Sequence, residues 1–141
     1  MYMSIASEAM SPEQLDEILL ESTNWNKPHH LTGCLAYVEG ELKGMNLCRF
    51  IQVLEGPEEE VLGIFNRIRQ DQRHMYVTVI KQGAITNRHF ASWEMGLERI
   101  NLNTNHEMQA YFEMDPEALA DDGSVHNNML LDFMKHFYIT T

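Results

Sequence analysis

Two side chains with hydrogen-bonding groups, those of Gln52 and Tyr2, stand in apolar stretches of this sequence. Gln52 is the polar residue within the run Phe50–Leu54, and its amide can donate and accept hydrogen bonds at once. Tyr2 carries a phenol, and a tyrosine in a strand is usually a packing residue. A buried amide is costly without partners. Gln52 is therefore either a structural amide bonded to neighbouring backbone, which the octapeptide Arg49–Gly56 alone favours, or a group that contacts a ligand.

Other residues with catalytic potential form no recognisable active site. His29 and His30 lie in an expected loop, and the acids of Glu58–Glu60 suit the first turn of a helix, where they complement its dipole. Cys34 and Cys48 have no metal-ligand spacing and are expected to be reduced core residues of a cytoplasmic protein. The sequence therefore predicts neither an enzyme nor a metal site.

Length, charge and hydropathy exclude several classes of function. The chain has 141 residues, enough for one domain with its own core, and a net charge of −11. This charge argues against binding to nucleic acid or to an anionic membrane surface. No apolar run approaches the roughly 20 residues needed to cross a bilayer. A cytoplasmic protein is the expectation.

Capping signals and periodicity place the elements around Tyr2 and Gln52. Ser11, Pro12 and Gln14 predict a helix start with a serine cap, a first-turn proline and a capping box. Pro28 predicts its end, because proline disfavours helical geometry in the residue before it. In the strand around Gln52, alternation places Ile51 and Val53 on one face and Gln52 on the other. The predicted elements of this half are a strand at 2–7, a helix from 12 to about 25, a strand at 31–38, a loop at 41–48 and a strand at 49–56.

The second half continues with the same kinds of signal. Pro57 and the following acids open a second helix, and the expected inner face of this helix consists of Val61, Leu62, Phe65 and Ile68. Further predicted elements are a polar loop at 70–74, strands at 75–80 and 90–97, a short helix opening at 115–116, a break at 121–124 and a helix at 127–137.

The resulting element order is typical of an α+β, ferredoxin-like βαββαββ fold. It implies a five-stranded mixed sheet with two helices on one face, because both crossovers are right-handed. The first and third strands are neighbours in this arrangement, so Tyr2, Ser4 and Gln52 would face the groove between the helices. We divide the chain into a domain at 1–98 and a helical extension at 99–141, which packs on the open sheet face or on a partner.

Several segments in one order carry a resemblance to a known family. They are Tyr2-Met3-Ser4, Asn26, Leu31-Thr32-Gly33, Phe50 to Pro57, Asp71 to His74, and Phe90 to Met95 with its Trp-Glu-Met sequence. Together they resemble the BLUF family, the blue-light sensors that use flavin, in its short single-domain type. The resemblance covers residues 2 to about 98.

The resemblance implies a flavin between the two helices, usually FAD, with FMN and riboflavin as alternatives. Tyr2 would be the electron and proton donor, and Gln52 would bridge Tyr2 and the flavin ring and change its hydrogen bonds after light. The residues implied to hold the flavin are Ser22, Asn26, Arg67, Asp71, Arg73 and His74. The implied relay that passes on the state of Gln52 consists of Ser4, Trp93 and Met95.

Two hypotheses about function follow. The first is a flavin photoreceptor without enzymatic activity of its own, which signals to a protein partner or through a homo-oligomer. The alternative is a flavin-free BLUF-like interaction module. Trp25 favours this alternative, because it stands where the family often has a polar or histidine residue. The position of Tyr2 close to the start favours it too.

Overall fold

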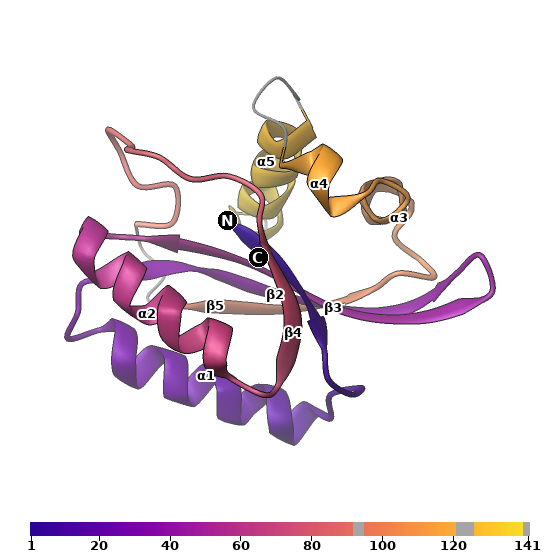
Figure 1. Cartoon of the computed structure of the whole chain (residues 1–141), viewed down its shortest axis with the longest axis horizontal. Helices are drawn as coiled ribbons and strands as arrows, with labels where there is room; N and C mark the ends of the chain where they lie inside the picture. Colours follow the sequence, from indigo (N-terminus) through magenta and orange to yellow (C-terminus); the bar gives the residue numbers. More distant parts are fainter. Residues whose placement is uncertain (92–94, 121–125, 140–141) are drawn as a thin grey trace.

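The computed structural model describes residues 1–91, 95–120 and 126–139. Five strands and two long helices form the first part of the chain, and three helices follow (Figure 1). The elements are β1 (Tyr2–Ala6), α1 (Pro12–Asn26), β2 (Thr32–Leu42), β3 (Met45–Glu55), α2 (Glu58–Gln70), β4 (His74–Val79), β5 (Gly96–Asn101), α3 (His106–Phe112), α4 (Pro116–Leu119) and α5 (His126–Ile139).

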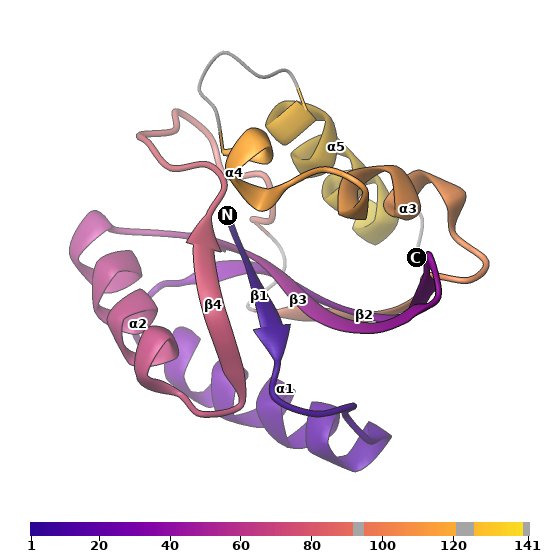
Figure 2. The same cartoon turned by 45° about the vertical axis from the view of Figure 1, so that its right-hand side comes forward.

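The strands form one mixed sheet in the order β4-β1-β3-β2-β5. β5 pairs parallel with β2, and the other neighbours are antiparallel. α1 and α2 cover one face of the sheet, whereas α3, α4 and α5 lie on the opposite side (Figures 1 and 2). The predicted α+β class, the mixed sheet and the central pairing of β1 with β3 are confirmed.

Alternation along β3 divides the core into two clusters. Ile51 and Val53 pack with Met108, Leu130 and other residues of the C-terminal helices. On the opposite face, Phe50 and Leu54 pack with residues of α1 and with Met95. Gln52 is on this second face, as the alternation predicts, so the α1/α2 side of the sheet carries the polar group.

In the hairpin between β2 and β3, the strands are longer and the turn is shorter than predicted. The expected loop at 41–48 is wrong, because β2 runs to Leu42 and β3 begins at Met45. Lys43 and Gly44 both have positive φ, 52° and 79°. This is the backbone of a two-residue type I′ turn, whose twist matches that of the two strands and lets pairing continue to their ends.

The fifth strand also begins later than predicted. Of the expected strand at 90–97, residues 96 and 97 belong to β5, which starts at Gly96, whereas residues 90, 91 and 95 are not in a strand and residues 92–94 lie outside the described residues. The side-chain carboxylate of Glu55 accepts hydrogen bonds from the backbone N–H groups of His89 and Phe90, at 2.8–3.0 Å. These donors are therefore occupied by a side chain and cannot pair in a sheet.

The C-terminal segment contributes to the core of the sheet. Residue 98, the expected division of the chain, lies inside β5, and helical structure begins at α3, which was not predicted. Asn105 caps α3 by accepting a hydrogen bond from the N–H of Met108 at 2.9 Å. Met108, Tyr111 and Leu119 are buried in the cluster that covers Ile51. Among the described residues, no helix is long and apolar enough to cross a membrane.

β4 is an edge strand with a local irregularity. Its register with β1 shifts between Met3 and Ile5. Tyr76, in β4, has a φ of 52° and is 78% exposed. A β-bulge of this kind increases the local twist of the strand.

Gly33 stands where the β3 backbone leaves no room for a side chain on β2. A Cβ atom at this position would lie 1.9 Å from the carbonyl oxygen of Val53. We expect Gly33→Ala to lower the free energy of unfolding by about 3 kcal/mol or more, because the strand backbones must separate. Urea unfolding measures this change.

Gly63→Ala is the matched control for this prediction. Gly63 lies in α2, and a Cβ atom there would meet nothing within 4 Å. We expect this variant to raise the free energy of unfolding by about 0.5–1 kcal/mol, the helix propensity difference. Equal effects at both positions would contradict the close-approach explanation.

Candidate functional site

A pocket of about 650 Å3 lies between α1, α2 and the sheet face that carries Gln52. This volume is within the range of small-molecule sites, about 300–1,000 Å3. The predicted site residues that line it are Tyr2, Ser22, Asn26, Gln52, Arg67, Asp71, Arg73 and His74. Residues as far apart in the sequence as Tyr2 and His74 therefore meet around one cavity.

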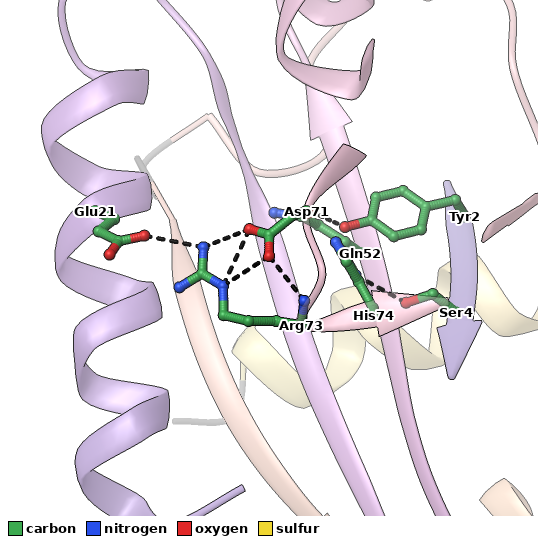
Figure 3. A network of polar contacts seen from close by, with 7 residues as sticks. All are labelled: Tyr2, Ser4, Glu21, Gln52, Asp71, Arg73 and His74. Atoms are coloured by element: carbon green, nitrogen blue, oxygen red, sulfur yellow. Dashed lines mark hydrogen bonds and ion pairs between the residues drawn. The ribbon is translucent and has the colours of Figure 1, made fainter. Parts of the chain in front are cut away.

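Tyr2 and Gln52 form a buried pair at the sheet side of the pocket. They are directly opposite each other in the β1–β3 register, so their side chains share one face. The Tyr2 hydroxyl donates a short hydrogen bond to Oε1 of Gln52 (Figure 3), and both residues are less than 5% exposed. Burial, together with the negative charge of Asp71, raises the pKa of Tyr2 well above its ordinary value of 10. The phenol is therefore held protonated, as a donor.

The other end of the Gln52 amide contacts a sulfur atom. Nε2 of Gln52 donates to Sδ of Met95 at 3.5 Å, and Met95 is buried. A thioether is a weak acceptor, so this contact holds the amide less strongly than a carbonyl oxygen would. The amide is thus fixed firmly at its oxygen and loosely at its nitrogen.

His74 connects the pocket to Ser4, a residue of β1 predicted to belong to the relay. Its Nδ1 lies 3.0 Å from Oγ of Ser4, at hydrogen-bond distance. The imidazole also packs edge-on against Phe50, with ring centroids 5.6 Å apart. Burial lowers the pKa of His74, and the negative charge of Asp71 opposes this change without reversing it. The neutral imidazole is therefore the favoured form in the folded protein.

An ion-pair network closes one side of the pocket. The Arg73 guanidinium contacts both carboxylate oxygens of Asp71 and reaches Glu21 of α1 at 2.9 Å (Figure 3). Burial disfavours ionisation of Asp71, but the hydrogen bonds and charge of Arg73 outweigh it and lower the pKa of Asp71. The bond to Asp71 raises the pKa of Arg73. Arg73 therefore links α1 to the turn before β4 with its charge balanced by acids.

A stack of three side chains forms where the end of α1 meets α2. The Arg67 guanidinium lies 4.0 Å from the centroid of the Trp25 ring, and the His29 imidazole is stacked on Trp25 with a centroid distance of 4.3 Å. The indole Nε1 of Trp25 is buried and has no hydrogen-bond partner within the described protein. Because a buried donor without a partner is costly, a ligand acceptor in the pocket would stabilise this arrangement.

The inner face of α2 borders the pocket instead of packing fully on the sheet. The inward stripe runs through Val61, Ile64, Phe65 and Ile68, at i, i+3, i+4 and i+7, yet α2 has no fully buried residue. The prediction that Leu62 belongs to this face is wrong, since Leu62 is 48% exposed and lies outside the stripe. A planar apolar ligand would cover this face, which fits a flavin ring.

Some site residues lie elsewhere, and others were missed. Ser4 and Met95 reach the site only through His74 and Gln52, respectively. Trp93 lies outside the described residues. Lining residues not predicted from sequence include Glu21 and Ile64. Both could have been found by helical spacing, since they stand four residues before Trp25 and Ile68.

Comparisons with known proteins show the family to which most of the chain is related. Residues 1–96 match the family described as BLUF, sensors of blue-light using FAD. The chain is similar to the photoactivated adenylate cyclase subunit beta of Euglena gracilis, with 35% identity over 91 residues, covering 64% of this chain and 10% of that protein. The chain thus spans about a tenth of the length of the curated relatives it matches.

Solved structures show the same fold. A bacterial light-regulated adenylyl cyclase is 30% identical with a TM-score of 0.60, over 79% of this chain and 31% of that chain. BlrB, a BLUF protein in its dark state, has a TM-score of 0.68 at 24% identity, over 96% of this chain and 92% of that chain. The second likeness extends through the C-terminal helices and supports the fold alone.

The lowered pKa of His74 predicts a pH dependence of stability. Between its folded pKa and the ordinary value of 6.5, the unfolded chain binds the proton more readily, so stability falls as pH falls through this window. We therefore expect the stability of the unchanged protein, relative to His74→Asn, to rise with pH below about 6.5 and to level off above it. Urea unfolding at a series of pH values measures the difference. A difference that is constant across this range would contradict the burial of a neutral imidazole.

Proposed function

The chain belongs to the BLUF family of blue-light flavin sensors, and from this premise we propose that it is a photoreceptor that holds a flavin between α1 and α2. The observation that carries the proposal is the buried Tyr2–Gln52 pair, which stands at the wall of a pocket of about 650 Å3. Few structural needs explain a phenol and an amide paired inside an apolar sheet, because an apolar pair there would avoid the cost of desolvation.

The pocket supplies groups for each part of a flavin. The apolar stripe of α2 and the side chains of Leu35 and Leu54 suit the ring system. Asn26, buried at the end of α1, would hold the polar edge of the ring, and the unpartnered Nε1 of Trp25 would donate to a further oxygen. Ser22, Asp71, Arg73 and His74 line the remaining walls.

Tyr2 and Gln52 would perform the primary step. When bound, the flavin supplies an oxidant that accepts one electron under blue light. Loss of an electron makes the Tyr2 hydroxyl a strong acid, and its proton already points at Oε1 of Gln52. The nearby negative charge of Asp71 favours the oxidised phenol for the same reason that it raises the pKa of Tyr2.

Gln52 would then store the signal. A proton on Oε1 turns this atom from an acceptor into a donor, so the amide must exchange partners by rotation or tautomerisation. Its two arrangements differ by a few hydrogen bonds, each worth about 1 kcal/mol net. The weak contact from Nε2 to Met95 is the bond that the exchange gives up most readily. Trp93, Met95 and Ser4 are the residues proposed to pass this change onward.

Arg67 favours a phosphorylated flavin, either FAD or FMN. Arg73 is paired with two carboxylates, whereas Arg67 contacts the Trp25 ring and forms no ion pair within the described residues. Both arginines line the pocket. Arg67 is therefore the cation proposed to bind a phosphate. Riboflavin has no phosphate, so Arg67 would not raise its affinity.

The photoreceptor is proposed to act without catalysis of its own. The relatives named above join a related segment to an adenylate cyclase, and this chain would signal instead to a separate protein partner or through a homo-oligomer in the cytoplasm. The second candidate function is a flavin-free interaction module. The Arg67–Trp25–His29 stack supports it, because the stacked side chains already occupy the rim of the pocket.

An absorption spectrum before and during blue light tests the proposal. A bound flavin whose band shifts slightly to the red and recovers in darkness would establish the photoreceptor. A protein that neither contains flavin nor takes up added FAD or FMN would instead establish the interaction module.

Tyr2→Phe should bind flavin but lose the light-induced shift, because the phenyl ring keeps the packing against Phe65 and has no proton to donate. We expect the amplitude of the shift to fall at least about tenfold. Tyr37→Phe is the matched control, since Tyr37 is equally buried in the sheet but does not line the pocket. A normal shift in Tyr2→Phe would remove Tyr2 from the mechanism.

Arg67→Gln should weaken binding of FMN about tenfold or more while leaving riboflavin binding within about threefold, because only FMN carries the phosphate charge. Arg69→Gln removes the same charge from α2. Arg69 lies over the Phe65 ring and does not line the pocket, so this control should leave both affinities unchanged. Fluorescence titration of the two flavins provides the dissociation constants. Equal losses for FMN and riboflavin would place Arg67 at the ring instead.

A further inference from the structure

A buried carboxylate stands on the same strand as Gln52 but on the opposite face of the sheet. Glu55 is 4% exposed and accepts hydrogen bonds from the N–H of His89 at 2.8 and 3.0 Å and from that of Phe90 at 2.9 Å. Nδ1 of His89 is a further contact at 3.3 Å. No lysine or arginine pairs with Glu55 in the described part of the chain.

The segment held by Glu55 leads to the partner of Gln52. The described part of the connection that follows β4, residues 80–91, lies on the side of the sheet that carries α3 to α5 (Figures 1 and 2). Phe90 belongs to the core cluster on that side, whereas Met95, five residues later, belongs to the cluster on the pocket side. Phe90 and Met95 therefore lie on opposite faces of the sheet.

Two contacts with β3 thus hold two residues that are five positions apart in the chain. Glu55 binds Phe90, and Gln52 contacts Met95. The two strand residues are about 10 Å apart along β3, at 3.3 Å per residue. Arg88, two residues before Phe90, adds an anchor by donating to Oγ1 of Thr32 at 2.9 Å. A short chain tethered this way leaves Met95 little freedom to leave the amide.

The hydrogen bonds between Glu55 and the His89–Phe90 backbone are better suited to positioning this segment than to stabilising the fold. A buried carboxylate is costly, and a neutral side chain could fill the same space at lower cost. Backbone N–H donors, however, bind a charged acceptor with short, directional bonds. We propose that Glu55 is a positioning residue of the light switch, which holds the His89–Phe90 backbone so that the Met95 thioether stays against the Gln52 amide in the dark. This inference rests on the proposed function.

The first test uses the flavin-free protein, so that it does not depend on light activity. In Glu55→Gln, one amide oxygen replaces two carboxylate oxygens, and we expect hydrogen exchange at the His89 and Phe90 amides to rise about tenfold. The 13C resonance of the Met95 methyl group should move toward its value in the unfolded chain. An unchanged Met95 resonance would overturn the proposal.

The control must remove a carboxylate from a strand without changing the hydrogen bonds between Glu55 and the His89–Phe90 backbone. Glu39→Gln does so, because Glu39 lies on β2 and accepts a hydrogen bond from the Tyr37 hydroxyl at 2.7 Å. We expect this variant to leave the Met95 resonance in place even if stability falls. A shift of the same size in Glu39→Gln would reduce Glu55 to a merely structural residue and overturn the proposal.

The second test uses the flavin-loaded protein. Glu55→Gln should keep the light-induced shift but slow its recovery in darkness about threefold or more, because the dark arrangement loses the Met95 contact. Recovery at the unchanged rate would overturn the proposal. If Glu55→Gln fails to fold, Glu55→Asp replaces it, because this variant keeps the charge but has a shorter side chain. It must also move the Met95 resonance toward its unfolded value and slow the recovery in darkness. Absence of flavin binding in the unchanged protein would refute the proposed function, and the Met95 resonance would still decide the role of Glu55.

Discussion

The hydrogen bond between the Tyr2 hydroxyl and the Gln52 amide is the interaction on which the site depends, and the sheet is arranged to impose it. Direct opposition in the β1–β3 register brings the two side chains together. A slip of one residue would turn Gln52 to the face packed by α3 to α5. The alternation of Ile51 and Val53 against the C-terminal helices makes such a slip costly, because it would expose both aliphatic side chains. The apolar core thereby fixes a polar contact that could not support itself.

The helices on the two faces of the sheet also differ in whether apolar packing or charge holds them in place. α3, α4 and α5 seal one face of the sheet with apolar side chains, whereas α1 and α2 leave a pocket over the other. Arg73 bridges Glu21 and Asp71 across this opening, so charge holds the helical side of the site where packing is incomplete. A ligand that filled the pocket would complete the burial of α2, which has no fully buried residue of its own.

Local signals in the sequence were sufficient for much of this arrangement. The capping box at Ser11 set the start of α1, and two-residue alternation assigned Gln52 to its face. The start of β5 could not be predicted from the apolar run beginning at Phe90. The backbone N–H of Phe90 donates to Glu55, 35 residues earlier in the chain, and is therefore not available for pairing in the sheet. The exposed distal end of the β2–β3 hairpin was missed for another reason. Its polar composition resembles a loop, and only the turn at Lys43 and Gly44 shows that pairing continues. Non-local hydrogen bonds and solvated strands leave no periodic apolar pattern to detect.

The bulge in β4 has a consequence for self-association. An edge strand offers a row of unpaired backbone groups to any other extended chain, and a bulge interrupts that row and twists it away. Tyr76, with its positive φ, stands where such a row would otherwise run straight. Growth of the sheet by addition of a strand from another copy is therefore disfavoured at this edge. The backbone of β4 thus protects this edge of the sheet by its own geometry.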